Sequence, residues 1–219
     1  MQSVCVIHPD AIPVMNLLRG TMRRCIFFVL VLAGWNVAPV SLQAAAYTVS
    51  NFAGASGYTG PDDGTGAAAR FSSPNAIAVQ SNGNVYVADS GNNTIRLISS
   101  TGVVSTFAGL AGVFGSADGS GVAASFYAPK GLAIDASGTL YVGDTYNHVI
   151  RKITAAGVVS TLAGTPGSIG SSDGSGAAAR FNYPLGVAVD SGGNVYVADS
   201  LNHTIRKITA GGVPRCRSA

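Results

Sequence analysis

Aspartate and arginine recur at fixed positions along the chain, and they are the residues whose types and spacing best suit acid–base chemistry. The aspartates stand 55 residues apart and an arginine follows each after seven residues: the pairs are Asp89 and Arg96, Asp144 and Arg151, and Asp199 and Arg206. A carboxylate near a guanidinium can serve in catalysis, or it can hold a turn closed. Because every copy carries the pair, we interpret these six residues as structural parts of the repeat.

Two histidines and three Asp-Gly loops suggest a bound metal as another possible chemistry. His148 and His203 lie in different copies, and the other histidine, His8, lies near the N-terminus. Catalytic zinc typically needs three protein ligands, and a calcium loop of the EF-hand type needs several carboxylates and a distal glutamate. The chain has no glutamate, and each Asp-Gly loop offers one or two aspartates. We therefore expect turn-stabilising histidines, no metal site and no cofactor.

The elements that position these residues follow from an internal repeat. The 55-residue interval also relates Phe71, Phe126 and Phe181, and Pro74, Pro129 and Pro184, so three copies occupy residues 48–102, 103–157 and 158–212. Within a copy, short runs with alternating side chains, such as NVYVAD, are separated by glycine-containing turns. That pattern is typical of β-strands, and four short strands per repeat predict a propeller blade.

The motif of these copies resembles the NHL repeat. The resemblance rests on P-x-G-[LV]-A-[IV]-D, on YV-[AG]-D, and on the Asn-His pairs at 147–148 and 202–203. It implies an all-β fold: a β-propeller of four-stranded blades, with three blades present in residues 47–212. The first copy departs from the motif, because Asn92 and Asn93 replace the Asn-His pair.

Residues that differ between the copies are the candidates for binding. In a four-stranded meander, the long connection into the first strand and the turn between the second and third strands open on one face, and long loops on a rigid scaffold commonly bind ligands. The candidates on that face are Tyr127, Lys130, Tyr146, Tyr183 and Leu201. We therefore expect a non-catalytic module that binds or scaffolds a protein, a peptide or a glycan. The alternative is a metal-dependent propeller enzyme, similar to lactonases or to the amidating lyase.

The composition and the N-terminus bear on location. A basic pair, Arg23 and Arg24, precedes the apolar run CIFFVLVLA, and AAA at 44–46 fits a cleavage site. We expect an N-terminal extension and signal peptide over residues 1–46, with the signal at about 22–46, and an exported protein, periplasmic or extracellular. A net charge of +3 gives no reason to expect a nucleic-acid partner, and no membrane contact is expected beyond the signal.

The ends of the repeat region predict an incomplete ring. Closed propellers use about four to eight blades, whereas three are present here. YTVSNFAG at 47–54 is similar to the last strand of a blade, and the tail at 213–219 loses the strand pattern at Pro214. We expect an open arc, from a truncated gene product or from half of a six-bladed pair, that can self-associate through its unpaired edges.

Overall fold

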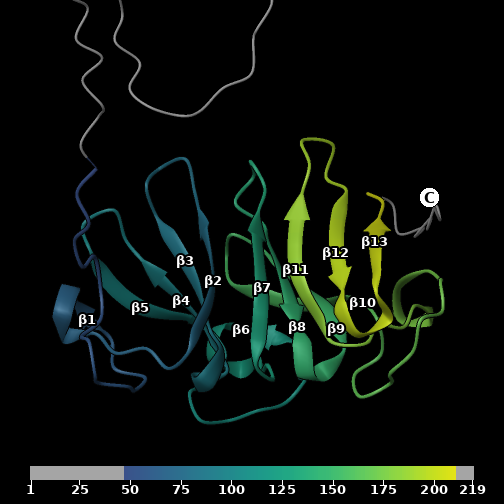
Figure 1. Cartoon of the computed structure of the whole chain (residues 1–219), viewed down its shortest axis with the longest axis horizontal. Helices are drawn as coiled ribbons and strands as arrows, with labels where there is room; N and C mark the ends of the chain where they lie inside the picture. The colour runs from purple at the N-terminus through teal and green to yellow at the C-terminus, as the bar shows by residue number, and fades with distance from the viewer. Residues whose placement is uncertain (1–46, 211–219) are drawn as a thin grey trace, which may run out of the picture. The chain divides into compact units, whose positions relative to one another are not determined.

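The computed structural model describes residues 47–210 of the 219-residue chain (Figure 1). The expected signal peptide and the divergent tail from residue 213 lie outside the described residues. Among residues 47–210, no helix has the length and apolar character needed to cross a membrane.

Short strands and single-turn 3₁₀ helices make up the described region. The strands are β1 (Gly64–Thr65), β2 (Pro74–Val79), β3 (Val85–Asp89), β4 (Thr94–Ile98), β5 (Val103–Ala108), β6 (Gly119–Ser120), β7 (Pro129–Ile134), β8 (Leu140–Asp144), β9 (Val149–Ile153), β10 (Val158–Ala163), β11 (Pro184–Val189), β12 (Val195–Asp199) and β13 (Thr204–Ile208). The 3₁₀ helices are η1 (Gly66–Ala68), η2 (Ser90–Asn92), η3 (Gly121–Ala123), η4 (Thr145–Asn147), η5 (Gly176–Ala178) and η6 (Ser200–Asn202).

The strands form three antiparallel meanders, which we call blades 1, 2 and 3. Blade 1 has the order β1-β5-β4-β3-β2, blade 2 the order β6-β10-β9-β8-β7, and blade 3 the order β11-β12-β13. The strands that begin with proline, β2, β7 and β11, pair with β3, β8 and β12. In each pair the register shifts just after the proline. This arrangement confirms the predicted all-β architecture of propeller blades.

Blades 1 and 2 are each assembled from two consecutive copies of the repeat. Strands β2 to β4 come from the first copy, whereas β5, the fourth strand of that blade, begins the second copy. The loop before each blade also adds a two-residue strand: Gly64 pairs with Val104 in blade 1, and Gly119 pairs with Val159 in blade 2. Among the described residues, the corresponding segment of the third copy has no strand assignment.

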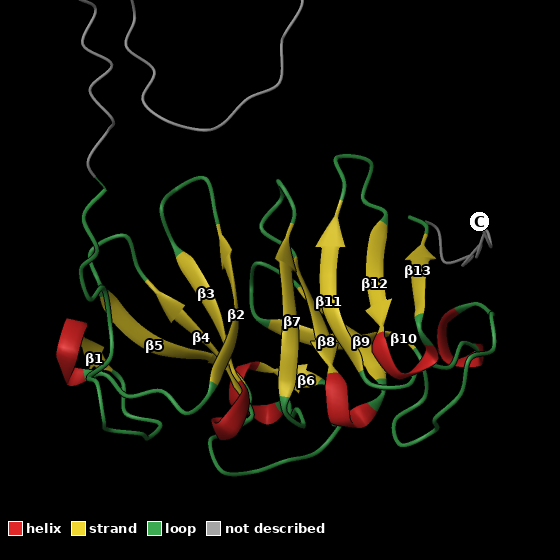
Figure 2. Cartoon of the chain, viewed as in Figure 1, coloured by secondary structure: helices red, strands yellow, loops and turns green. Residues whose placement is uncertain are grey.

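The hydrophobic core lies between the blades as well as within them. One cluster joins Ile95 and Ala108 of blade 1 to Leu140 and Val142 of blade 2, and a second joins Ile150 of blade 2 to residues of blade 3. Alternation within strands sends side chains to both faces of each sheet, so a blade flanked on both sides buries both faces. The 3₁₀ helices and long loops lie at one end of the blades, and the turns between their first and second strands lie at the other (Figure 2).

The last strand of a blade that the sequence suggests at 47–54 is not formed in the structure. Residues 47–52 have no strand assignment, and Val49 is fully exposed. At the corresponding positions of the next two copies, Val104 and Val159 are buried within β5 and β10, which pair with β4 and β9. Within residues 47–210 no strand lies beside residues 47–54, so the prediction was wrong for a physical reason: a strand needs a partner to hydrogen bond with.

Candidate functional site

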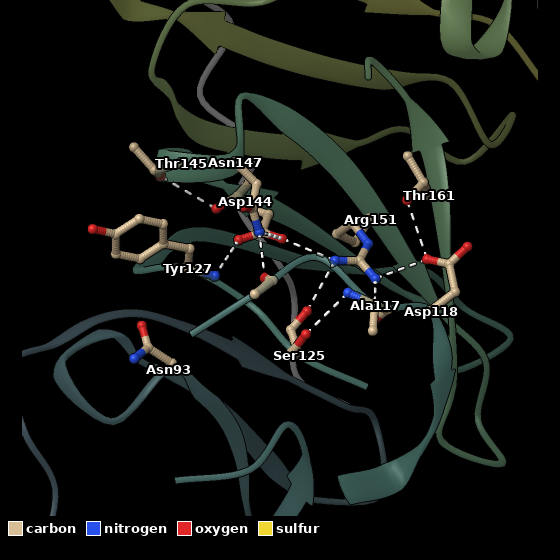
Figure 3. Close-up of polar contacts among 12 residues, drawn as sticks. Asn93, Ala117, Asp118, Ser125, Tyr127, Asp144, Thr145, Asn147, Arg151 and Thr161 are labelled. Carbon is tan, nitrogen blue, oxygen red and sulfur yellow. Dashed lines mark hydrogen bonds and ion pairs between the residues drawn. The ribbon is translucent and has the colours of Figure 1, made fainter. Parts of the chain in front are cut away.

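The recurring aspartates and arginines form one buried network in each blade. In blade 2, Arg151 donates to Asp144 over 3.0 Å, and both side chains are fully buried. The same carboxylate accepts hydrogen bonds from the Asn147 side chain and from the main-chain N–H of Tyr127, each over 2.8 Å (Figure 3). The equivalent pairs in blades 1 and 3 have the same 3.0 Å separation. Asp144 is thus enclosed by donors from the turn, the next strand and the long loop.

The arginine extends this network to the long loop. The other terminal nitrogen of Arg151 donates to Asp118 over 2.8 Å and to the carbonyl oxygen of Ala117 over 2.9 Å (Figure 3). Its guanidinium also lies over the ring of Phe126, 5.3 Å from the centroid. These contacts hold the Asp-Gly loop against the blade. The repeated aspartates of those loops therefore have a structural role.

Burial raises the pKa of two buried carboxyl groups of these networks, Asp89 and Asp144. Desolvation raises the pKa of Asp144 to about 6, while hydrogen bonds from Asn147 and Tyr127 and the charge of Arg151 act in the opposite direction. Desolvation also raises the pKa of Asp89, which lies at the same position in blade 1. The carboxylate of Asp144 is therefore ionised at neutral pH and becomes protonated in mild acid.

The turn between the second and third strands links neighbouring blades. Asn93 and His148 close that turn with left-handed backbone, each with a φ of 59°. The Asn93 side chain accepts a hydrogen bond from the main-chain N–H of Ala128 in blade 2, over 2.8 Å. His148 Nδ1 accepts one from the N–H of Tyr183 in blade 3, over 3.1 Å. Asparagine and histidine are thus interchangeable here, because both adopt the left-handed region readily and both offer a side-chain acceptor.

Replacing His148 with alanine should therefore lower the free energy of unfolding by about 1–3 kcal/mol, because the N–H of Tyr183 loses its acceptor. His148→Asn should retain most of the stability, since the Asn93 side chain already accepts the equivalent hydrogen bond between blades 1 and 2. Urea denaturation of the three proteins measures the difference. Equal losses for both variants would contradict the hydrogen-bond role.

Acid should weaken the same contact. Desolvation lowers the pKa of His148 below its ordinary value of 6.5, against the opposing charge of Asp199. As the pH falls, the unfolded chain takes up this proton before the folded one does, so stability is lost below about pH 6.5. His148→Asn should lose less stability than the natural protein between pH 7 and pH 5. The comparison cancels the effect of Asp144, which both proteins share; parallel pH profiles would refute the role of the imidazole.

Four aromatic rings lie in contact on the loop face of blades 2 and 3. The ring of Tyr127 stacks on Phe114 with centroids 4.8 Å apart, and it meets Tyr146 edge-on at 5.0 Å. Tyr146 in turn meets Tyr183 at 5.3 Å, and the amine of Lys130 lies 5.1 Å from the Tyr146 ring centroid. We call Phe114, Tyr127, Tyr146 and Tyr183, with Lys130, the aromatic cluster.

The cluster combines most of the residues proposed from the sequence. Four of the five candidates meet there, although Tyr127 and Tyr183 are 56 positions apart in the chain. Leu201 occupies the position in η6 that corresponds to Tyr146 in η4, and it is 54% exposed without a ring contact to the cluster. Sequence reasoning missed Phe114, which is 65% exposed. The sequence could have indicated Phe114, because this position also varies between the copies: the corresponding residues are Thr59 and Ile169.

Potential metal ligands do not gather in the part of the chain that the structure describes. Within residues 47–210, no three side chains among His, Cys, Asp and Glu lie close enough together to hold an ion. The Nδ1 atom of His148 already accepts a hydrogen bond from the main-chain N–H of Tyr183.

Comparison with known proteins identifies the repeat. The family described as the NHL repeat matches residues 71–96, 126–153 and 181–208, one match for each blade. The chain belongs to the NHL-repeat β-propeller family. Each match covers the first two strands of its blade and all or part of the third, and it includes the buried Asp and Arg of the network described above.

Two relatives of this chain are much longer proteins. The chain is 36% identical over 132 residues to the chloroplastic protein SUPPRESSOR OF QUENCHING 1 of Arabidopsis thaliana, with 56% of this chain and 12% of that protein covered. It is 34% identical over 151 residues to NHL repeat-containing protein 2 of Gallus gallus, covering 63% and 21%. The chain thus spans about a fifth or less of the length of these relatives.

A solved structure with a similar fold is an auxiliary nutrient binding protein from Bacteroides thetaiotaomicron. It matches with a TM-score of 0.53 and 26% sequence identity, over 60% of this chain and 36% of that one.

Proposed function

We propose that this NHL-repeat chain is an exported, non-catalytic binding module, and that its ligand surface is the aromatic cluster. The observation that carries the proposal is the continuous contact of four rings contributed by two blades. Tyr127 and Tyr146 remain 36% and 38% exposed while their loops are fastened to buried networks. Rigid, half-exposed tyrosines offer a large contact area at little cost in conformational entropy.

A glycan is the ligand that this surface fits best among the three classes expected. Sugar rings present an apolar C–H face and a polar rim, and an amphipathic tyrosine can contact both. The amine of Lys130 adds a positive charge beside Tyr146, which favours a carboxylated or otherwise acidic sugar. The similarity to a nutrient-binding protein of Bacteroides thetaiotaomicron supports a ligand taken up from outside the cell.

Substituting Tyr146 with alanine should weaken glycan binding about tenfold or more, a loss of about 1.4 kcal/mol. Tyr58→Ala is the matched control, because Tyr58 is 68% exposed and lies outside the cluster. Affinity electrophoresis through gels that contain neutral or acidic polysaccharides compares the proteins. If no polysaccharide retards the natural protein, or if both variants lose binding equally, the proposal fails.

The non-catalytic part of the proposal has a separate test. The purified protein should hold no stoichiometric zinc or calcium after dialysis, and it should not turn over lactones or peptidylglycine substrates. Elemental analysis and substrate assays measure both. Retained metal together with turnover would instead support the propeller-enzyme alternative.

A further inference from the structure

One short turn positions all three tyrosines of the aromatic cluster. The turn contains η4, and Tyr146 lies at its centre. At one end, Asp144 accepts a hydrogen bond from the main-chain N–H of Tyr127 over 2.8 Å (Figure 3), and the N–H of Tyr146 donates to the carbonyl oxygen of Tyr127 over 3.1 Å. At the other end, His148 Nδ1 accepts from the N–H of Tyr183 over 3.1 Å. The geometry of the cluster therefore depends on the acceptors at the two ends of this turn.

The contact between His148 and Tyr183 joins two blades. His148 belongs to blade 2 and is 6% exposed, and its ring meets the ring of Tyr183 edge-on with centroids 4.9 Å apart. The carbonyl oxygen of Tyr183 accepts a hydrogen bond from the N–H of Ser200, in its own blade, over 3.3 Å. Because Tyr146 and Tyr183 come from different blades, their mutual position depends on contacts such as this one.

The imidazole of His148 is an acceptor that acid removes. Nδ1 accepts the hydrogen bond in the neutral ring, whereas both nitrogens of an imidazolium are donors. Protonation would set a new N–H against the N–H of Tyr183, and the main chain at Tyr183 would have to move away. The hydroxyl group of Thr145 donates to the carbonyl oxygen of Pro184 over 2.8 Å and does not titrate in this range. Blades 2 and 3 therefore stay in contact when Tyr183 is released.

Charged and titratable groups reach this imidazole from both blades. Burial lowers its pKa below the ordinary value of 6.5, against the charge of Asp199 of β12 in blade 3. Its own turn contributes Asp144 and Tyr146, and β7 contributes Lys130, whose amine lies over the Tyr146 ring. Strand β11 and the loop at 164–170, which donates a hydrogen bond to the turn, carry no titratable side chain. The imidazole therefore takes up its proton only below about pH 6.5.

We propose that His148 is a pH switch of the aromatic cluster, so that acid releases Tyr183 and weakens ligand binding there; this inference rests on the proposed function. At neutral pH the imidazole holds Tyr183 against Tyr146, and the cluster is complete. In mild acid the imidazolium displaces Tyr183, and the ligand loses one of its rings. At the equivalent contact between blades 1 and 2, Asn93 does not titrate, and the residue that it holds is Ala128, which has no ring.

A measurement without ligand tests the release of Tyr183. Amide signals of the protein that carries isotopically labelled tyrosine are followed by NMR from pH 7.5 to pH 5.0, and Tyr183→Phe assigns the signal. In the natural protein this signal should shift with a midpoint below pH 6.5. In His148→Asn it should not show that midpoint, because the asparagine side chain accepts the hydrogen bond and does not titrate. A signal that stays constant in the natural protein, or that titrates alike in both proteins, would overturn the proposal.

Binding measurements test the consequence for the ligand. Calorimetric titration with laminarin, which is neutral, and with polygalacturonate, whose carboxylates stay ionised in this range, compares each protein with itself at pH 7.5 and pH 5.0. Circular dichroism first shows that both proteins are folded at pH 5.0. The natural protein should lose about three- to tenfold more affinity than His148→Asn, in proportion to the fraction of neutral imidazole. Asp144, whose pKa is about 6, is present in both proteins, so the comparison cancels its effect.

The outcomes separate this inference from the proposed function. If neither protein binds either polysaccharide at pH 7.5, the proposed function fails, and the pH switch fails with it. If the natural protein binds at pH 7.5 and both proteins lose affinity equally at pH 5.0, the switch alone is overturned and the proposed function stands.

Discussion

Replacing Asp144 with alanine should lower the free energy of unfolding by about 3–5 kcal/mol, because it leaves the buried guanidinium of Arg151 without its buried counter-charge. The carboxylate also accepts from Asn147 and from the N–H of Tyr127, so two further donors lose a partner. The loss exceeds the 1–3 kcal/mol that is typical of a single buried polar group left without a hydrogen bond. Urea denaturation at one fixed protein concentration measures it.

The control for this change is Asp118→Ala, which removes the other carboxylate that contacts Arg151. Asp118 lies closer to the guanidinium, 2.8 Å against 3.0 Å, but its side chain is 53% exposed. Solvent screens an exposed ion pair, so the expected loss is about 0–1 kcal/mol. Burial rather than distance should thus decide the ranking. Equal losses at the two positions would contradict the structural role assigned to Asp144.

The second large effect is expected at Gly131, where the first strands of blades 2 and 3 approach closely. A methyl group at this position would overlap the main-chain oxygen of Leu185 and come within 2.9 Å of Val187 Cγ2. The backbone oxygen cannot rotate away as a side chain can, so Gly131→Ala should cost about 1–3 kcal/mol or more through overpacking. Thermal denaturation should show a lower melting temperature.

The matched control is Gly186→Ala, at the corresponding position of blade 3. A methyl group there meets only the Cβ of Ala198, at an ordinary 3.6 Å. Its effect should be small, or slightly stabilising through the reduced freedom of the unfolded chain. Blade 1 already carries alanine, Ala76, at this position of its first strand. A neutral Gly131→Ala would mean that the two blades can move apart without loss of packing.

Local patterns were sufficient to predict the strands and their grouping into blades. The alternation in runs such as NVYVAD depends on neighbouring residues only, the 55-residue interval can be read directly from the sequence, and the meander follows from the short turns. The same reasoning failed at residues 47–54, whose sequence suits a fourth strand but which have no third strand beside them among the described residues. It also gave no indication of β1 and β6, because Gly64 and Gly119 have no intrinsic preference for strands.

The candidate site was predictable in its residues but not in its contacts. Variation between copies singled out Tyr127, Tyr146 and Tyr183, yet their mutual contact depends on how blades 2 and 3 pack. The hydrogen bond from the N–H of Tyr183 to His148 joins residues 35 positions apart and requires left-handed backbone at both, with φ values of 54° and 59°. Neither the proximity of these two residues nor their backbone conformation can be inferred from composition or spacing.

Because blades 1 and 2 each take three strands from one copy and their fourth from the next, the repeat boundary falls inside a sheet. An additional 55-residue unit introduced between residues 157 and 158 would supply the fourth strand of one blade and the first three of another. Each new contact would use side chains that already meet in blades 1 and 2, with no change of register. Gene duplication can therefore lengthen the array by whole blades in a single event, without an intermediate that lacks a strand.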